Sequence, residues 1–189
     1  MGITAWGPTM WMRLFALSAL LGAMLTMAAP VRASELIAPF VGDYVGSAEM
    51  VAADGTRIPR DMNVSIRANK EGFTVEWTST TRKPDGRLKS KSYSIDFLPT
   101  DRGGVYSAGM RKNVFGHSVQ LDPMKGEPFV WGRIRGDMLT VFSLFVDENG
   151  DYEIQQFDRT LAEGGLNLKF TDWRNGEPQR TVETFLKRQ

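Results

Sequence analysis

Turn signals recur at short intervals through the chain from residue 43 onward, and this spacing limits the possible folds more than any other feature. Asp-Gly, Asn-Gly and Gly-Gly pairs separate runs that are rich in β-branched and aromatic residues. Asp-Gly and Asn-Gly favour tight hairpins, because both central residues of a type I′ turn need a positive φ. From residue 43 onward, helical periodicity does not extend beyond about two turns. The sequence therefore predicts a meander of antiparallel strands.

Apolar and polar residues alternate within several of these runs. Phe73, Val75 and Trp77, for example, are separated by Thr74 and Glu76. This alternation is typical of a sheet with one dry face and one wet face. The ten predicted strands cover residues 43–52, 60–69, 73–82, 88–98, 105–110, 128–134, 138–147, 151–161, 166–173 and 179–187.

A long meander of this kind has to hide the edges of its sheet. Closing the sheet on itself removes them, so we expect an all-β fold, an antiparallel up-and-down barrel of about ten strands. A β-sandwich is the alternative. Because about eight strands already leave room for one small ligand, a ten-stranded barrel predicts an internal cavity.

One predicted strand departs from the alternating pattern. Residues 139–146 are apolar on both faces except at Thr140 and Ser143. The outer side of this strand should therefore be covered by another part of the chain. The long connection 111–127 is the candidate, either as a packed loop or as a lid.

The N-terminus has the three parts of a secretory signal peptide. Arg13 precedes an apolar run over residues 14–28, and Val31 and Ala33 supply small side chains before a cleavage point. The run is shorter than the roughly 20 residues of a membrane-spanning helix. We expect residues 1–33 to be removed, leaving one domain, 34–189, in the periplasm or secreted. A retained anchor is the alternative, and Met12 is a second possible start.

Composition excludes several functions for residues 34–189. Two of the 23 Lys and Arg residues lie in the predicted signal, which leaves 21 basic against 22 acidic residues. This balance gives no basic excess for nucleic acid. Cysteine is absent, so neither a disulfide nor a thiolate nucleophile is available.

Catalytic residues are scarce as well. The single histidine, His117, rules out a multi-histidine metal site. A set of His117, Ser118 and Asp122 lacks the Gly-x-Ser-x-Gly turn of serine hydrolases. We therefore predict no enzymatic activity, no catalytic residue, no metal and no cofactor. His117 is read as a loop residue, or as a ligand contact at a barrel mouth, which includes axial haem ligation with Met110 or Met124 as second ligand.

The segment Phe40-Val41-Gly42-Asp43-Tyr44-Val45-Gly46 leads into the first predicted strand. It resembles the Gly-x-Trp motif of lipocalins and other calycins, with tyrosine in place of tryptophan. The resemblance implies that Tyr44 plugs the closed end of the barrel and that Arg180, Lys187 or Arg188 lies across it.

Within the calycins, fatty-acid-binding proteins share the ten strands but insert two helices after the first. Here Asp54-Gly55 makes a direct turn, and the Arg-x-Tyr clamp of that group is missing. The chain is most similar to uncharacterised exported calycin-like bacterial proteins.

A candidate ligand site follows from the predicted inward faces. Trp131 and Arg133 share a face of their strand, and an arginine turned inward needs a partner because a lone buried charge is costly. Asp158 or an acidic ligand would supply that partner; otherwise Arg133 faces water. The predicted ligand-binding residues are Tyr44, Trp77, Tyr93, Phe97, Phe115, His117, Trp131 and Arg133.

These observations predict a non-enzymatic protein that holds a small apolar or amphipathic molecule inside its barrel. The alternative is a structural or interaction protein with a filled barrel, whose outer surface and 111–127 loop contact a protein partner. An outer-membrane barrel is disfavoured, because Lys89, Lys91 and Glu76 stand in the middle of predicted strands.

Overall fold

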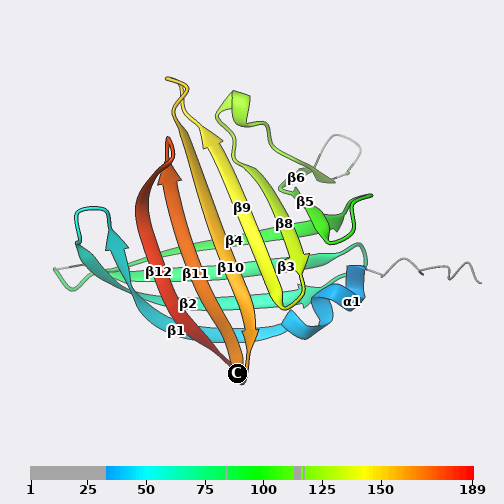
Figure 1. The fold of residues 1–189 in the computed structure, drawn as a ribbon, viewed down its shortest axis with the longest axis horizontal. Helices are drawn as coiled ribbons and strands as arrows, with labels where there is room; N and C mark the ends of the chain where they lie inside the picture. Colours follow the sequence, from blue (N-terminus) through cyan, green and yellow to red (C-terminus); the bar gives the residue numbers. More distant parts are fainter. Residues whose placement is uncertain (1–32, 84, 113–115, 117) are drawn as a thin grey trace, which may run out of the picture. The chain divides into compact units, whose positions relative to one another are not determined.

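The computed structural model describes residues 33–83, 85–112, 116 and 118–189. In this part of the chain ten long strands close into an antiparallel barrel, in the order β1-β12-β11-β10-β9-β8-β5-β4-β3-β2 (Figure 1). Their bounds are β1 Gly42–Ala52, β2 Arg57–Ala68, β3 Phe73–Arg82, β4 Leu88–Pro99, β5 Val105–Gly109, β8 Phe129–Arg135, β9 Met138–Val146, β10 Tyr152–Ala162, β11 Gly165–Arg174 and β12 Glu177–Arg188.

The predicted barrel is confirmed, and each predicted strand corresponds to one observed strand. The alternative sandwich is wrong, because β1 pairs with both β2 and β12 and so closes the sheet. The turn chemistry explains the hairpins. Asn175 and Gly176, for example, have φ values of 50° and 85°, as a tight turn between β11 and β12 requires.

One end of the barrel is closed by the segment that precedes β1. This segment forms α1 (Ala33–Ile37) and η1 (Ala38–Phe40). Ile37 and Phe40 are fully buried and pack in the main core with residues such as Leu166 and Leu186.

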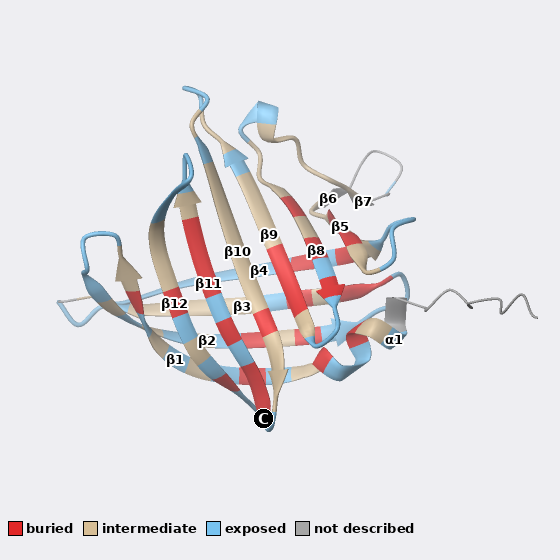
Figure 2. Cartoon of the chain, in the orientation of Figure 1, coloured by how far each residue is buried: buried red, intermediate tan, exposed pale blue. Residues whose placement is uncertain are grey.

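Figure 2 shows how buried and exposed positions alternate along the barrel strands. The dry face of the sheet therefore becomes the barrel interior.

Tyr44 is the plug of this closed end, as the resemblance to calycins implies. Its ring is 1% exposed, and its hydroxyl donates a hydrogen bond to Phe40 O at 2.7 Å. Of the three basic candidates, Arg188 lies across the ring, whereas Arg180 lies toward the opposite end, paired with Ala52. The ten-stranded barrel and its covered plug together fit a calycin-like fold.

The long 111–127 connection has some structure of its own. It contains β6 (Arg111–Lys112), β7 (Ser118–Val119) and the short helix η2 (Pro123–Lys125), which contacts β9. On the outer side of β9, Trp131 from the neighbouring β8 stacks on Phe142, with ring centroids 4.8 Å apart. A neighbouring strand therefore shields part of the apolar outer side of β9.

No helix among the described residues is long and apolar enough to cross a membrane.

Candidate functional site: the barrel cavity

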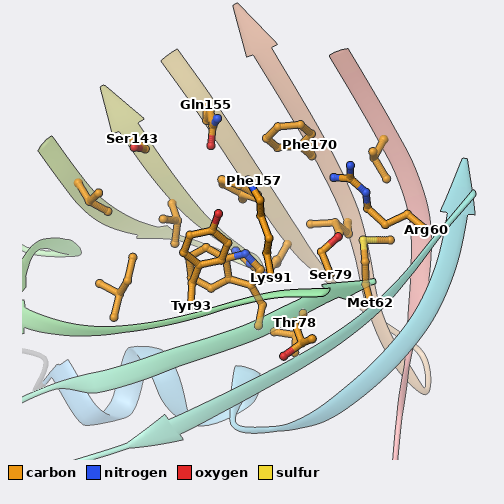
Figure 3. A pocket seen from close by; sticks show the side chains of 18 of the residues that line it. Arg60, Met62, Thr78, Ser79, Lys91, Tyr93, Ser143, Gln155, Phe157 and Phe170 are labelled. Atoms are coloured by element: carbon orange, nitrogen blue, oxygen red, sulfur yellow. The ribbon is translucent and has the colours of Figure 1, made fainter. Parts of the chain in front are cut away.

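A cavity of about 470 Å³ occupies the barrel interior away from the closed end. This volume falls within the roughly 300–1,000 Å³ usual for small-molecule pockets. Inward side chains from β2, β3, β4 and from β8 to β12 form its wall (Figure 3). The sequence expectation of an internal cavity is thus confirmed for the described residues.

An aromatic belt surrounds the middle of the cavity. Trp77 stacks on Tyr93 with ring centroids 5.0 Å apart, and it also contacts Phe157 at 5.7 Å. Phe157 in turn contacts Phe170 at 4.6 Å. Tyr93 is 47% exposed, so one of these rings remains open to solvent. The belt offers a broad apolar surface to whatever enters the barrel.

The apolar wall is combined with positive charge. Among the described residues that line the cavity, five are basic and none is acidic. The basic residues are Arg60, Lys89, Lys91, Arg159 and Arg180.

Arg60, Lys89 and Arg180 lie toward the mouth, the end of the barrel where β3 passes into β4. Cross-strand pairing places Arg60 beside Thr81 and Thr81 beside Lys89, close to that turn. Burial lowers the pKa of Arg60, and the neighbouring charge of Arg180 lowers it further. Arg60 Nε is buried and makes no hydrogen bond to the described residues.

Arg180 is neutralised by the protein itself. Its Nε donates to Asp172 Oδ2 at 2.5 Å, and its Nη2 contacts Asp172 and also lies 3.3 Å from Glu153 Oε1. Burial raises the pKa of Asp172, which is 1% exposed, while the bond from Arg180 opposes that rise. Arg180 therefore has its counter-charges in place without a ligand.

Arg159, unlike Arg180, has no acidic partner in an ion pair among the described residues. It is 1% exposed, yet its Nε and Nη1 find no hydrogen-bond partner among the described residues. Within this part of the chain, no carboxylate lies within 4.0 Å of it in an ion pair. Burial lowers the pKa of Arg159 to about 10, although Asp158 on the other face opposes the shift. The guanidinium carbon lies 5.6 Å from the centre of the Phe157 ring.

The predicted site residues are divided among four places. Trp77 and Tyr93 line the cavity. Tyr44 and Phe97 are buried in the core and are not part of the cavity wall. Phe115 and His117 lie outside the described residues. The remaining two, Trp131 and Arg133, are on the outer face of the barrel.

The inward register predicted for Trp131 and Arg133 is therefore wrong. In β8 the buried residues are Val130, Gly132 and Ile134, whereas Arg133 is exposed and lies over the Phe142 ring at 5.5 Å. A Cβ on Gly132 would lie only 3.0 Å from the Phe97 ring, so the inner face here accepts no large side chain. The aromatic residues of β8 consequently lie outside.

The predicted register of β10, which placed Asp158 on the inner face, is also wrong by one residue. Asp158 faces outward, where it accepts hydrogen bonds from Thr140 at 2.7 Å and from Gln156 at 2.7 Å. No ion pair joins it to Arg133 in the part of the chain that the structure describes. Arg159, which sequence reasoning missed, belongs to the inward set with Phe157. The pairing of Phe157 with Phe170 and Val141 in the neighbouring strands marks that face.

The acidic turn between β9 and β10 is held by the chain itself. Arg174 Nη2 lies 2.6 Å from Asp147 and 3.0 Å from Asp151, and Asn175 also donates to Asp151. No group of three or more potential metal ligands occurs among the described residues. The turn therefore satisfies its own carboxylates.

Comparison with protein families and with curated proteins found no match. Among solved structures, the chain is similar to an S-type phycobiliprotein lyase CPES from Guillardia theta, with a TM-score of 0.38 and 9% identity over 82% of this chain and 92% of that one. It is also similar to a putative AttH from Nitrosomonas europaea, with a TM-score of 0.27 and 13% identity over 77% of this chain. The match covers 49%, about half, of that protein. At these scores the similarities assign neither a family nor a function.

Proposed function

We propose that this barrel is a non-enzymatic binding protein that holds a small amphipathic molecule in its interior. The observation that carries the proposal is the cavity of about 470 Å³, which joins an aromatic belt to a basic mouth. An apolar wall with a few polar groups is the usual composition of a small-molecule site.

The competing function, a filled barrel that acts only through its surface, does not explain the cavity. A filled barrel would bring side chains from opposite walls into contact along its whole length. Here the main core fills the closed end, and a smaller cluster of Met50, Phe170 and Val182 lies on one wall of the open half. In that half Tyr93, Lys89 and Lys91 remain exposed, and the cavity of about 470 Å³ is left unfilled. The barrel interior therefore has room for a small molecule.

The test is the uptake of N-phenyl-1-naphthylamine, a neutral apolar dye that fluoresces in dry surroundings. Ser143 is half-buried and faces the cavity, so S143W places a large ring inside it. Ser47 is exposed on β1, so S47W adds the same group to the outer face. We expect the wild type and S47W to take up the dye and S143W to lose most uptake. Equal uptake by S143W, or none by the wild type, would contradict the proposal.

We also propose that the protein acts outside the cytoplasm after its signal peptide is cleaved. The support is the arrangement of Arg13, the apolar run 14–28 and the small residues up to Ala33. N-terminal sequencing of the exported protein should begin at Ser34. A mature chain that retains residues 14–28 would show that the segment is an anchor.

A further inference from the structure

The unpaired guanidinium of Arg159 indicates what kind of molecule the cavity accepts; this inference rests on the proposed function. The side chain lines the cavity, is 1% exposed, and leaves Nε and Nη1 without partners among the described residues. Buried polar atoms in native proteins are nearly always hydrogen-bonded, and each exception needs an explanation, such as a bound ion or a functional role. Arg159 is such an exception.

The charge of Arg159 cannot be avoided by deprotonation. Its pKa of about 10 still leaves the guanidinium protonated at neutral pH. Burying an unpaired charge in an apolar environment is energetically unfavourable. The ring of Phe157 offsets only part of this cost, because a cation–π contact is weaker than an ion pair. An anion that enters from solution would supply the counter-charge that the described residues do not.

The other basic residues of the cavity need no such anion at depth. Arg180 already contacts Asp172 and Glu153, while Lys89 and Lys91 are exposed to water. In the strand register Arg159 lies opposite Leu168 of β11 and Leu139 of β9, deeper in the barrel than the residues of the mouth. Arg60 also leaves its Nε without a partner among the described residues, but it lies at the mouth and is only half-buried. Arg159 is therefore the deepest of these charges, and it has no ion pair in the described part of the chain.

We propose that Arg159 binds the carboxylate of a monoanionic amphiphile, which enters the barrel acid first and extends its apolar chain along the aromatic belt. One positive charge matches a singly charged group, whereas a doubly charged phosphate would keep an uncompensated charge in the apolar interior. A guanidinium also fits the two oxygens of a carboxylate. The basic mouth would attract such an anion from solution.

The experiment compares two probes of equal chain length, myristate and the uncharged tetradecanol, as competitors of N-phenyl-1-naphthylamine. The wild type should bind myristate more tightly than tetradecanol. In R159M we expect myristate binding to weaken about 10- to 100-fold, as expected for the loss of hydrogen bonds to a charged group, with little change for tetradecanol. R133M makes the same substitution on the outer face and should behave as the wild type.

The thermal stability of the empty protein gives a second readout. Removing an unpaired buried charge should raise the melting temperature of R159M, whereas loss of a structural contact would lower it. R159K, which keeps the charge, should retain part of the preference for myristate, and it serves in place of R159M if that variant does not fold.

The outcomes separate the two proposals. If the dye and tetradecanol bind but the wild type shows no preference for myristate, the barrel is a binding protein and the role of Arg159 is wrong. A preference that survives in R159M, or that R133M loses equally, overturns it as well. If neither the dye nor either competitor binds, the proposed function fails, and the inference fails with it.

Discussion

The guanidinium of Arg188, from the last strand, lies over the ring of Tyr44, from the first, with 5.0 Å between the guanidinium carbon and the ring centroid. Its Nη1 and Nη2 also donate to the carbonyl oxygens of Val41 and Pro39, at 2.6 and 2.9 Å. One side chain thus ties the end of the chain to the segment that closes the barrel.

We therefore expect R188M to lower the free energy of unfolding by about 1–2 kcal/mol, because it removes two charged hydrogen bonds and a cation–π contact at an exposed site. Urea denaturation measures the change. Lys187 is exposed on the opposite face of the same strand, so K187M is the matched control and should change stability by less than about 0.5 kcal/mol. Equal effects of the two variants would show that the contact with Tyr44 contributes nothing.

Gly72 marks a close approach between two strands. A Cβ at this position would lie 2.0 Å from the carbonyl oxygen of Phe97, which is backbone and cannot turn aside. We expect G72A to cost about 1–3 kcal/mol, the usual range for overpacking. Gly103 has nothing within 4 Å of its Cβ position, so G103A should be nearly neutral in the same thermal melts. A neutral G72A would mean that the β3–β4 pairing can move apart.

Ligand binding should be visible in tryptophan fluorescence, and the structure predicts which tryptophan reports it. Trp77 lines the cavity and stacks on Tyr93, whereas Trp131 stacks on Phe142 outside the barrel. Titration with myristate should change the emission of the wild type and of W131F, and the change should largely disappear in W77F. If W131F instead loses the signal, the ligand occupies the outer face.

The turn between β9 and β10 should contribute to stability in a pH-dependent way. Hydrogen bonds from Asn175 and Arg174 lower the pKa of Asp151 below its usual value of 3.8. A carboxylate with a lowered pKa binds protons less tightly in the folded state, so its stabilising contribution is present above the unfolded pKa and disappears as the pH falls through the folded one.

The melting temperature of the wild type should therefore exceed that of D151N at pH 5 to 7, and this gap should close on acidification below about pH 4. Thermal melts of both proteins across that range measure the effect. A gap that stays constant down to pH 2 would show that Asp151 does not titrate as its contacts require.

The architecture could be predicted from sequence because local chemistry decides it. Turns such as Asn175-Gly176 need positive φ, and alternation such as Phe73, Val75 and Trp77 assigns one face to the interior. Both signals act over a few residues and are independent of the rest of the chain. The role of Tyr44 as the plug of the closed end came instead from the resemblance of residues 40–46 to the calycin motif.

The cavity chemistry was decided by tertiary structure. In β8 and β10 both faces carry apolar side chains, so alternation alone does not determine which face is inside, and a shift of one residue exchanges the two faces. Contact between Gly132 and the Phe97 ring excludes large residues from the inner face of β8 and leaves Arg133 in water. The corresponding choice in β10 turns Asp158 outward and buries Arg159 without an ion-pair partner among the described residues. The sequence by itself determined the barrel, whereas strand packing decided that Arg159, and not Arg133, lines its cavity.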